Sequence, residues 1–537
     1  MKKSLLMIAA LAFGLLANAQ TQYFFSPEGN GDADGSSWEN AAAGEYLGET
    51  IEYAEVGDVF YLMEGNYLPS TTTNKWNIKQ GVIIKGGYPT TMTGTNTAID
   101  YSKAGQSIFS ADLDGDRKGD NIDYALVYIG PAGHENSGKV DGVAIEDGQY
   151  YKDVPLTEIW GVTFRDGARV GGEYFGNIMY LRHTKVDLHF CKFLNNVCGS
   201  ADKTAALISW GSQLRAFDCV FENNWSAGAG SAVLLRPRKS LSGNDVKEEN
   251  QLALFERCEF TNNQISGSYG GTLSVCDGGG TLYMINCTVT GGSQTYGGAI
   301  ALGGNDEDIN PCKAFLINNT FVDNASTRAN NWTGGAYRAG KNSHSYFINN
   351  VMVNPAAKDS YNVGEAVVEM QWANTSYTSA GYNIFGTFFE KADDCGTLAA
   401  TDKITTSVSN VQTQEKIFGT ATLADNGGFS KSFLPLAAQA TSLSVADLKA
   451  AVAAWPMEDA AKEVIDLTVD QRGAKRASTT MAGSIDGAAQ VPTAIENTTA
   501  TTIQDGIYYT LQGQALGKDF YALPSGMYIC NGVKIVK

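Results

Sequence analysis

The stretch Cys219–Leu235 reads CVFENNWSAGAGSAVLL, in which Cys-x-Phe-x-Asn-Asn is followed by a Gly/Ala step and an aliphatic run. Variants of this phrase recur along the chain around one hydrophobic anchor each: Phe164, Phe193, Phe221, Phe260, Val289, Phe321 and Met352. Successive anchors lie 28 to 39 residues apart. A supersecondary unit that repeats about every thirty residues indicates a solenoid.

A second set of short apolar runs lies between the anchors. These runs begin at Gly176, Thr204, Gly230, Gly270, Gly297 and Gly334. Each run is four to six residues long, too short for a helix, and glycine or asparagine stands at its ends. Each repeat therefore contains at least two short strands. Stacked parallel coils of this size predict an all-β fold, the right-handed parallel β-helix, because parallel crossovers are right-handed.

Stacking explains the residues around each anchor, because equivalent residues of successive coils lie about 4.8 Å apart and form columns. Two residues before the anchors stand Cys191, Cys219, Cys258, Cys287, Asn319 and Asn350. We expect them to face the interior like the anchors, with cysteine acting as a small hydrophobe. Disulfide bonds between neighbours are the alternative. Three residues after the anchors, an asparagine ladder is expected at a turn with left-handed backbone: Asn196, Asn224, Asn263 and Asn324.

These repeats resemble those of bacterial right-handed parallel β-helix surface proteins with a pectate-lyase-like fold. Gly297–Ile300 and Gly334–Tyr337 resemble the repeats of polymorphic outer-membrane proteins. The resemblance implies one β-helix over residues 20–490, with a cap at each end. A helix at about 38–54 would form the N-terminal cap and hide strand edges. Short motifs between residues 381 and 488 resemble the C-terminal closing segment of exported β-helix proteins. A helix-like stretch at about 444–463 interrupts them.

The N-terminal residues indicate export. Lys2 and Lys3 precede an apolar run, Leu5–Leu16, and Ala17-Asn18-Ala19 then precedes Gln20, which predicts a signal peptide over residues 1–19. The run is shorter than the roughly twenty residues of a membrane span, so no transmembrane segment is expected after cleavage. The net charge of −18 argues against nucleic acid as a partner. It is compatible with cation binding and with an exported protein.

The C-terminal residues resemble a sorting domain of type IX secretion. A Thr-rich linker is expected at 491–504 and the sorting domain at 505–537, carried by Tyr508–Gln514, Leu523–Ile529 and the basic end Lys534–Lys537. The resemblance implies the type IX secretion machinery as a partner. It also implies a secreted or cell-surface location.

Catalytic signatures of this fold are not found in the sequence. The carboxylate and Gly-His-Gly pattern of its glycosidases is missing, and the four histidines, His134, His183, His189 and His344, lack metal-ligand spacing. For His189 we expect a packed ladder position. Asp112, Asp114, Asp116 and Asp120 form an acidic turn whose spacing could hold Ca²⁺, although the glycine position departs from an EF-hand. A plain solvated turn is the alternative.

A candidate ligand site follows from aligning the apolar runs. Arg182, Trp210 and Arg236 stand at the same position of three successive repeats, with His183, Arg238 and Lys239 nearby. Such a column could bind a sugar ring by CH-π contact and anionic groups by paired guanidinium bonds. The alternative is that these side chains only cover a flank. The predicted function is adhesion or glycan binding without catalysis. A polysaccharide lyase or glycoside hydrolase on the same scaffold is the competing class.

Overall fold

The computed structural model describes residues 20–486 with internal gaps, and 508–509, 515–517, 527–530 and 533–536. The gaps are 70–74, 117–124, 131–153, 170–177, 200–205, 237–250, 267–269, 277–278, 295–297, 304–310, 327–334, 354–366, 371–373, 391–394 and 406–411. The chain divides into two compact units, 1–488 and 489–537. The proposed signal peptide, the linker and Asp120 lie outside the described residues.

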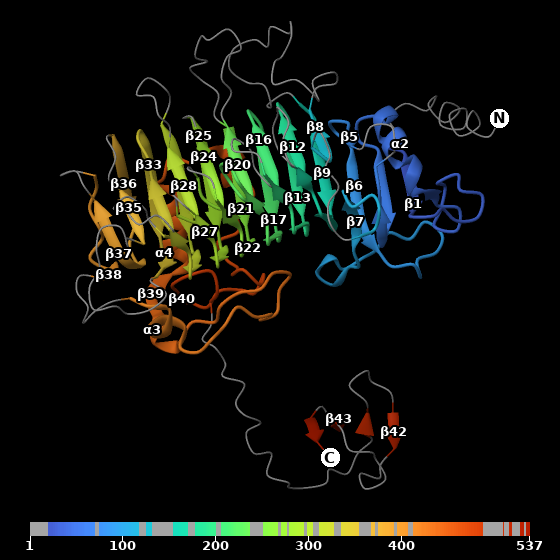
Figure 1. Cartoon of the computed structure of the whole chain (residues 1–537). Coiled ribbons are helices and arrows are strands. Elements are labelled where there is room, and N and C mark those ends of the chain that lie inside the picture. Colours follow the sequence, from blue (N-terminus) through green and yellow to red (C-terminus); the bar gives the residue numbers. More distant parts are fainter. Residues whose placement is uncertain are drawn as a thin grey trace, which may run out of the picture. The chain divides into compact units, whose positions relative to one another are not determined.

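The first unit is a right-handed parallel β-helix, whose strands lie side by side along the solenoid in Figure 1. One parallel sheet, here called the long sheet, receives a strand from nearly every coil. In spatial order its strands are β2 (Ala42–Ala43), β1 (Gln22–Ser26), β3 (Val59–Met63), β6 (Ile83–Tyr88), β9 (Leu156–Trp160), β13 (Lys185–His189), β17 (Gln213–Phe217), β21 (Gln251–Glu256), β25 (Gly280–Ile285), β29 (Cys312–Ile317), β33 (Ser343–Ile348) and β36 (Thr375–Ser379).

A second parallel ladder, the anchor ladder, contains the hydrophobic anchors. Its strands are β4 (Gly65–Tyr67), β7 (Ser107–Ser110), β10 (Val162–Arg165), β14 (Lys192–Leu194), β18 (Val220–Glu222), β22 (Glu259–Thr261), β26 (Thr288–Thr290), β30 (Thr320–Val322), β34 (Val351–Met352), β37 (Ile384–Glu390) and β38 (Lys403–Thr405). Its phenylalanines stack in register, with ring centroids 4.7 Å apart for Phe193 and Phe221 and 4.8 Å for Phe221 and Phe260. The predicted column of anchors is confirmed.

The apolar runs between anchors form a third ladder, the flank ladder, joined to the anchor ladder through β37. Its other strands are β5 (Trp76–Ile78), β8 (Val127–Ile129), β12 (Met179–Arg182), β16 (Leu207–Trp210), β20 (Val233–Arg236), β24 (Leu273–Cys276), β28 (Ile300–Gly303), β32 (Tyr337–Ala339) and β35 (Val368–Met370). A short fourth sheet follows the asparagine corner: β11 (Ala168–Arg169), β15 (Val197–Cys198), β19 (Trp225–Ser226), β23 (Gln264–Ile265), β27 (Ser293–Gln294) and β31 (Ala325–Ser326).

The interior cysteine column is present and its thiols are free. Cys191, Cys219, Cys258 and Cys287 are fully buried, and none of them forms a disulfide. Each thiol donates to a main-chain carbonyl of the preceding coil, for example Cys219 Sγ to Leu188 O at 3.6 Å. The thiols thus satisfy carbonyls at the corner of each coil. Burial raises the pKa of Cys219 and Cys287 well above the usual range of a thiol.

The asparagine ladder is present, with one correction. Asn196 Nδ2 donates to Asn224 Oδ1 and Asn224 Nδ2 to Asn263 Oδ1, both at 2.8 Å. The left-handed residue at this corner, however, is the one before the ladder position, for example Asn195 at φ 58° and Asn223 at φ 57°. The first asparagine of each pair reverses the chain, which leaves the second free to point inward and bind its neighbours.

The N-terminal cap is shorter than expected. Only Leu47–Tyr53 forms an α-helix, α2, preceded by a 3-10 turn, η1 (Gly44–Tyr46). Ala42–Ala43, inside the expected helix, instead pairs with β1 as an edge strand. Leu47 and Ile51 of α2 are fully buried and join the interior cluster that contains Trp76. The helix therefore fills the interior at the first coils, and the strand covers an edge.

Residues 412–486 return along the outside of the coils and lie beneath them in Figure 1. Their elements are α3 (Gln414–Phe418), η4 (Ala437–Gln439), β39 (Ala440–Ser444), α4 (Val445–Ala453), α5 (Asp459–Lys462) and β40 (Thr479–Met481), of which α4 and α5 lie in the expected helix-like stretch. Leu448 and Trp455 pack with Tyr283 and Phe315 on the outer face of the long sheet. The segment covers apolar side chains that would otherwise face solvent.

The second unit is a small antiparallel sheet. Its strands, in spatial order, are β42 (Ala515–Gly517), β41 (Tyr508–Tyr509), β43 (Met527–Cys530) and β44 (Val533–Val536). This matches the β structure expected for the C-terminal residues. Among the described residues of both units, no helix is long and apolar enough to cross a bilayer.

Candidate functional site

The structure brings the three residues of the predicted ligand site into one column. Arg182 pairs in register with Trp210 on β16, and Trp210 pairs with Arg236 on β20. All three side chains stand on the outer face of the flank ladder, because the alternate residues, such as Leu181 and Leu235, belong to the interior cluster.

The exposure of these side chains differs. Arg182 is only 3% exposed, whereas Trp210 and Arg236 are partly exposed. The Arg182 guanidinium lies 6.0 Å from the centroid of the Trp210 ring, a cation-π contact. One face of the indole is therefore covered by a cation and is closed to a sugar ring. The remaining recognition surface is the exposed part of the indole together with the guanidinium of Arg236.

The surroundings of the column are apolar on one side. Tyr180, Ile208 and Leu234 form a buried cluster on the outer face of the same strands, and Trp210 packs against it. His183 is buried in a left-handed turn at φ 45°, and its carbonyl accepts a hydrogen bond from Gln80 Nε2. Arg238, Lys239 and the loop residues 241–250 and 304–310 lie outside the described residues.

The acidic turn holds three carboxylates together. Ligand oxygens of Asp112, Asp114 and Asp116 all lie within 4.8 Å of one another. Backbone N–H groups orient two of them, since Gly115 N donates to Asp112 Oδ1 at 2.9 Å and Asp116 N to Asp114 Oδ1 at 3.1 Å. An all-oxygen donor set fits Ca²⁺, which takes six to eight oxygens, so these three residues would supply part of its coordination.

The ladder position expected for His189 is confirmed on the long sheet, but its stacking with Trp160 and Phe217 was missed from the sequence. Trp160 and His189 stack at 3.7 Å between centroids, and His189 and Phe217 at 4.9 Å. Lys85 Nζ lies 5.9 Å from the Trp160 centroid, and the Trp160 indole donates to Glu158 Oε2 at 3.0 Å. The signal was available, because each of the three rings stands four residues before a repeat anchor. As the rings stack on one another, they offer edges rather than faces to solvent.

The described histidines occupy structural positions. Burial, followed by the charges of Arg215, Arg257 and Lys85, lowers the pKa of His189 to about 3, so the ring is neutral near pH 7. His344 Nδ1 lies 2.6 Å from Ser376 Oγ and Nε2 lies 3.1 Å from Thr378 Oγ1. His134 lies outside the described residues.

Carboxylates on the outer face of the coils are held by arginines. Arg215 binds Asp187 through two hydrogen bonds of 2.7 and 2.6 Å, and Arg257 binds Asp218 through two of 2.9 and 2.8 Å. Glu256 also pairs with Arg257, at 2.6 Å, and burial raises its pKa to about 8. The Asp187–Arg215 and Asp218–Arg257 pairs stabilise the contacts between coils, and both of their carboxylates are bound by two hydrogen bonds each.

Comparison with known proteins identifies no family for this chain. No family model matches the chain, and no curated protein matches it. Among solved structures, it is similar to pectate lyase Pel9A at 10% identity and a TM-score of 0.33, covering 87% of this chain and 97% of that one. It is also similar to a polygalacturonase from Erwinia carotovora ssp. carotovora at 9% identity and a TM-score of 0.22, covering 75% and 99%. The fold assignment rests on the strand pairing described above.

Proposed function

We propose that this chain is an exported cell-surface protein that binds an acidic glycan without cleaving it. The observation that carries the proposal is the register of Trp210 and Arg236 on adjacent strands, both partly exposed, with Arg182 behind the indole. A guanidinium binds carboxylate or sulfate groups through two parallel hydrogen bonds, and a partly exposed indole adds apolar contact area. A parallel β-helix holds both side chains on a rigid surface.

Absence of catalysis is supported by the state of the candidate acid and base groups. Of the described histidines, His189 and His344 are held in stacking and hydrogen-bonding contacts and His183 is buried, and the carboxylates Asp187 and Asp218 each pair with an arginine. A polysaccharide lyase needs a base and a glycoside hydrolase needs a carboxylate pair that can exchange protons. Lyase or hydrolase activity is the second candidate function, and it is tested together with binding.

Export is part of the same proposal. It is supported by the signal-peptide pattern of residues 1–19 and by the resemblance of residues 505–537 to type IX sorting domains. The proposed location is secreted or cell-surface. Detection of the chain in the cytoplasm alone, with residues 1–19 retained, would contradict this part of the proposal.

The test is a glycan array combined with a screen for release of unsaturated uronates and reducing ends, using the chain from Gln20. We expect retention of acidic glycans without cleavage. Two variants should each weaken binding about tenfold, the equivalent of about 1.4 kcal/mol. They are Trp210→Ala and Arg236→Lys, which keeps the positive charge but loses the two parallel N–H donors of the guanidinium. Tyr53→Ala, at an exposed aromatic on α2, is the matched control and should bind as the parent does. Cleavage of any polymer would replace the proposal with the enzymatic alternative.

A further inference from the structure

Arg182 belongs to the column of the proposed glycan site but is not placed to contact a glycan. It is only 3% exposed, whereas Trp210 and Arg236, on the next two coils, are partly exposed. Its guanidinium lies 6.0 Å from the centroid of the Trp210 ring and covers one face of the indole. Any part that Arg182 has in recognition is therefore exerted through its neighbours and its charge.

The corner that follows these strands fixes the main chain of the column. The N–H of His183 donates to the carbonyl of Trp210 at 3.1 Å. One coil further on, the N–H of Gly211 donates to the carbonyl of Arg236, also at 3.1 Å. The carbonyl of Trp210 accepts a second hydrogen bond, from Ser212 Oγ at 3.0 Å. The strand ends are thus tied to one another, which holds the order guanidinium, indole, guanidinium along the solenoid.

The indole of Trp210 is restrained by contacts with its neighbours. It packs against the buried cluster of Tyr180, Ile208 and Leu234 on the outer face of the flank ladder. The Arg182 guanidinium adds a cation-π attraction across one ring face. Because packing and the cation restrict the ring together, its exposed part is presented beside Arg236 in a constant orientation.

Arg182 and Arg236 place positive charge on a chain whose net charge is −18. Strand pairing separates their main chains by two coils, about 10 Å. Both charges reach the same neighbour, since burial raises the pKa of Tyr180 to about 12 and each arginine opposes that rise. A buried charge is screened by salt less than an exposed one. Arg182 can therefore attract an anion at the surface of the column without touching it.

We propose that Arg182 makes this site selective for anionic over neutral glycans, by fixing the Trp210 indole and by its buried positive charge. The inference rests on the proposed glycan binding and assigns the residue that sets its specificity. Arg236 binds the anionic group, the exposed part of the indole contacts the sugar, and Arg182 is a positioning residue behind them. A neutral side chain of similar length would support the indole but would not attract the anion.

The test compares pairs of probes that differ mainly in charge. One pair is oligogalacturonate and its methyl ester, and the other is sulfated cello-oligosaccharide and its unsulfated form. Affinities for the chain from Gln20 are measured by calorimetry at low and at physiological ionic strength. We expect the parent to bind at least one acidic probe about tenfold more tightly than its neutral form. The preferred pair distinguishes a carboxylate from a sulfate as the recognised group.

Variants of Arg182 separate charge from packing. Arg182→Met removes the charge and should weaken binding of the acidic probe about tenfold, while binding of the neutral probe changes by less than about twofold. Arg182→Lys keeps the charge and should retain most of the selectivity.

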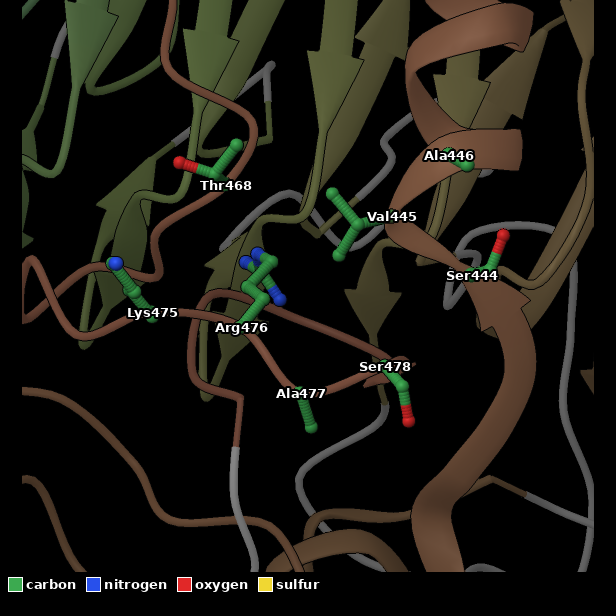
Figure 2. Close-up of a pocket in the computed structure, with 8 residues that line it drawn as sticks. All are labelled: Ser444, Val445, Ala446, Thr468, Lys475, Arg476, Ala477 and Ser478. Carbon is green, nitrogen blue, oxygen red and sulfur yellow. The ribbon is translucent and has the colours of Figure 1, made fainter.

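Two controls remove a positive charge elsewhere in the first unit. Lys475 is exposed and Arg476 is buried, and both line a cavity at the N-terminus of α4 (Figure 2). That cavity shares no residue with the glycan column. Lys475→Met and Arg476→Met should therefore keep the selectivity of the parent.

The outcomes separate this inference from the proposed function. Equal weakening of both members of a pair in Arg182→Met would show a purely structural role and overturn the inference, while glycan binding by the parent would stand. Loss of selectivity in a folded Arg182→Lys would overturn it as well, and this variant carries the test if Arg182→Met does not fold. A parent chain that does not prefer either acidic probe would contradict the proposed function itself, and the inference would fall with it.

Discussion

The backbone N–H of Cys287 donates to the side-chain oxygen of Asn319 at 2.9 Å, and the two residues are neighbours in one interior column. They also perform the same task. Cys287 Sγ donates to the carbonyl of Phe255 at 3.3 Å, and Asn319 Nδ2 donates to the carbonyl of Met284 at 2.8 Å. Where the column changes from cysteine to asparagine, the side chain still donates to the equivalent main-chain carbonyl of the preceding coil. An amide, however, makes more and stronger hydrogen bonds than a thiol.

That difference predicts unequal costs of substitution. Asn350 accepts from the backbone N–H of Asn319 at 3.0 Å and donates to the carbonyl of Leu316 at 2.7 Å, both in a fully buried corner. Asn350→Ala leaves these groups unsatisfied and should lower the free energy of unfolding by about 2 to 4 kcal/mol. Cys219→Ala, the matched control in the same column, should cost only about 1 kcal/mol. Denaturant unfolding checks both, and equal costs would contradict the assigned roles.

The ion pair between Asp187 and Arg215 predicts a large loss of stability. Asp187 is 6% exposed, and burial raises the pKa of its carboxyl group despite the opposing Arg215. Arg215→Met leaves a buried carboxylate unpaired and should cost about 3 to 5 kcal/mol at neutral pH. The loss should shrink toward acid pH, where protonation of Asp187 removes the unpaired charge.

The control for this pair is an exposed one. Lys103 and Asp100 pair at 3.0 Å, but the lysine side chain is 82% exposed. Lys103→Met should leave the free energy of unfolding nearly unchanged, because solvent screens this pair. Similar losses in both variants would show that the buried pair has no special role.

His189 predicts an acid-dependent loss of stability. Its folded pKa of about 3 lies below the value near 6.5 of an unfolded histidine, so the unfolded chain binds more protons between these values. The contribution of His189 is fully present above pH 6.5 and is lost as the pH falls toward 3. His189→Phe keeps a ring between Trp160 and Phe217 and should flatten the fall in melting temperature from pH 6.5 to 4.

Glu256 serves as the control for His189, because its stability contribution depends on pH in the opposite direction. Its folded pKa of about 8 is raised above the unfolded value, so its contribution is present below pH 4.5 and is lost as the pH rises toward 8. Glu256→Gln should reduce the fall in melting temperature from pH 6.5 to 8, whereas its melting temperature should still fall from pH 6.5 to 4, at least as steeply as that of the parent chain. If the melting temperature of His189→Phe falls from pH 6.5 to 4 as much as that of the parent chain, His189 is protonated in the folded chain.

Calcium should raise the melting temperature if the acidic turn holds it. The shift should saturate with calcium concentration and disappear in the Asp112→Asn, Asp114→Asn double variant. Asp100→Asn, at an exposed carboxylate outside the turn, should retain it. Absence of a saturable shift in the parent chain would show that this turn does not bind calcium.

Residues that repeat with the coil could be predicted from the sequence. The anchors, the cysteine column and the asparagine ladder were placed correctly, because each repeats at one position of the coil. The cap at 38–54 was placed too broadly, since Ala42–Ala43 pairs with β1 instead of continuing a helix. Its alanines favour a helix locally, and the exposed edge of β1 overrides that preference. The ladder position of His189 was expected, whereas its stacking with Trp160 and Phe217 was missed although the three positions repeat.

The sequence by itself determined the coils, because one residue type at one position of every repeat stacks about 4.8 Å from its copies and specifies register. The tertiary structure alone decided what surrounds the candidate sites and the buried charges. Arg182 covers one face of Trp210, and Arg476 reaches Asn286 across 190 residues of chain. Such contacts join segments without a shared period, and burial of their charges depends on packing between distant parts of the chain. No local pattern encodes that packing.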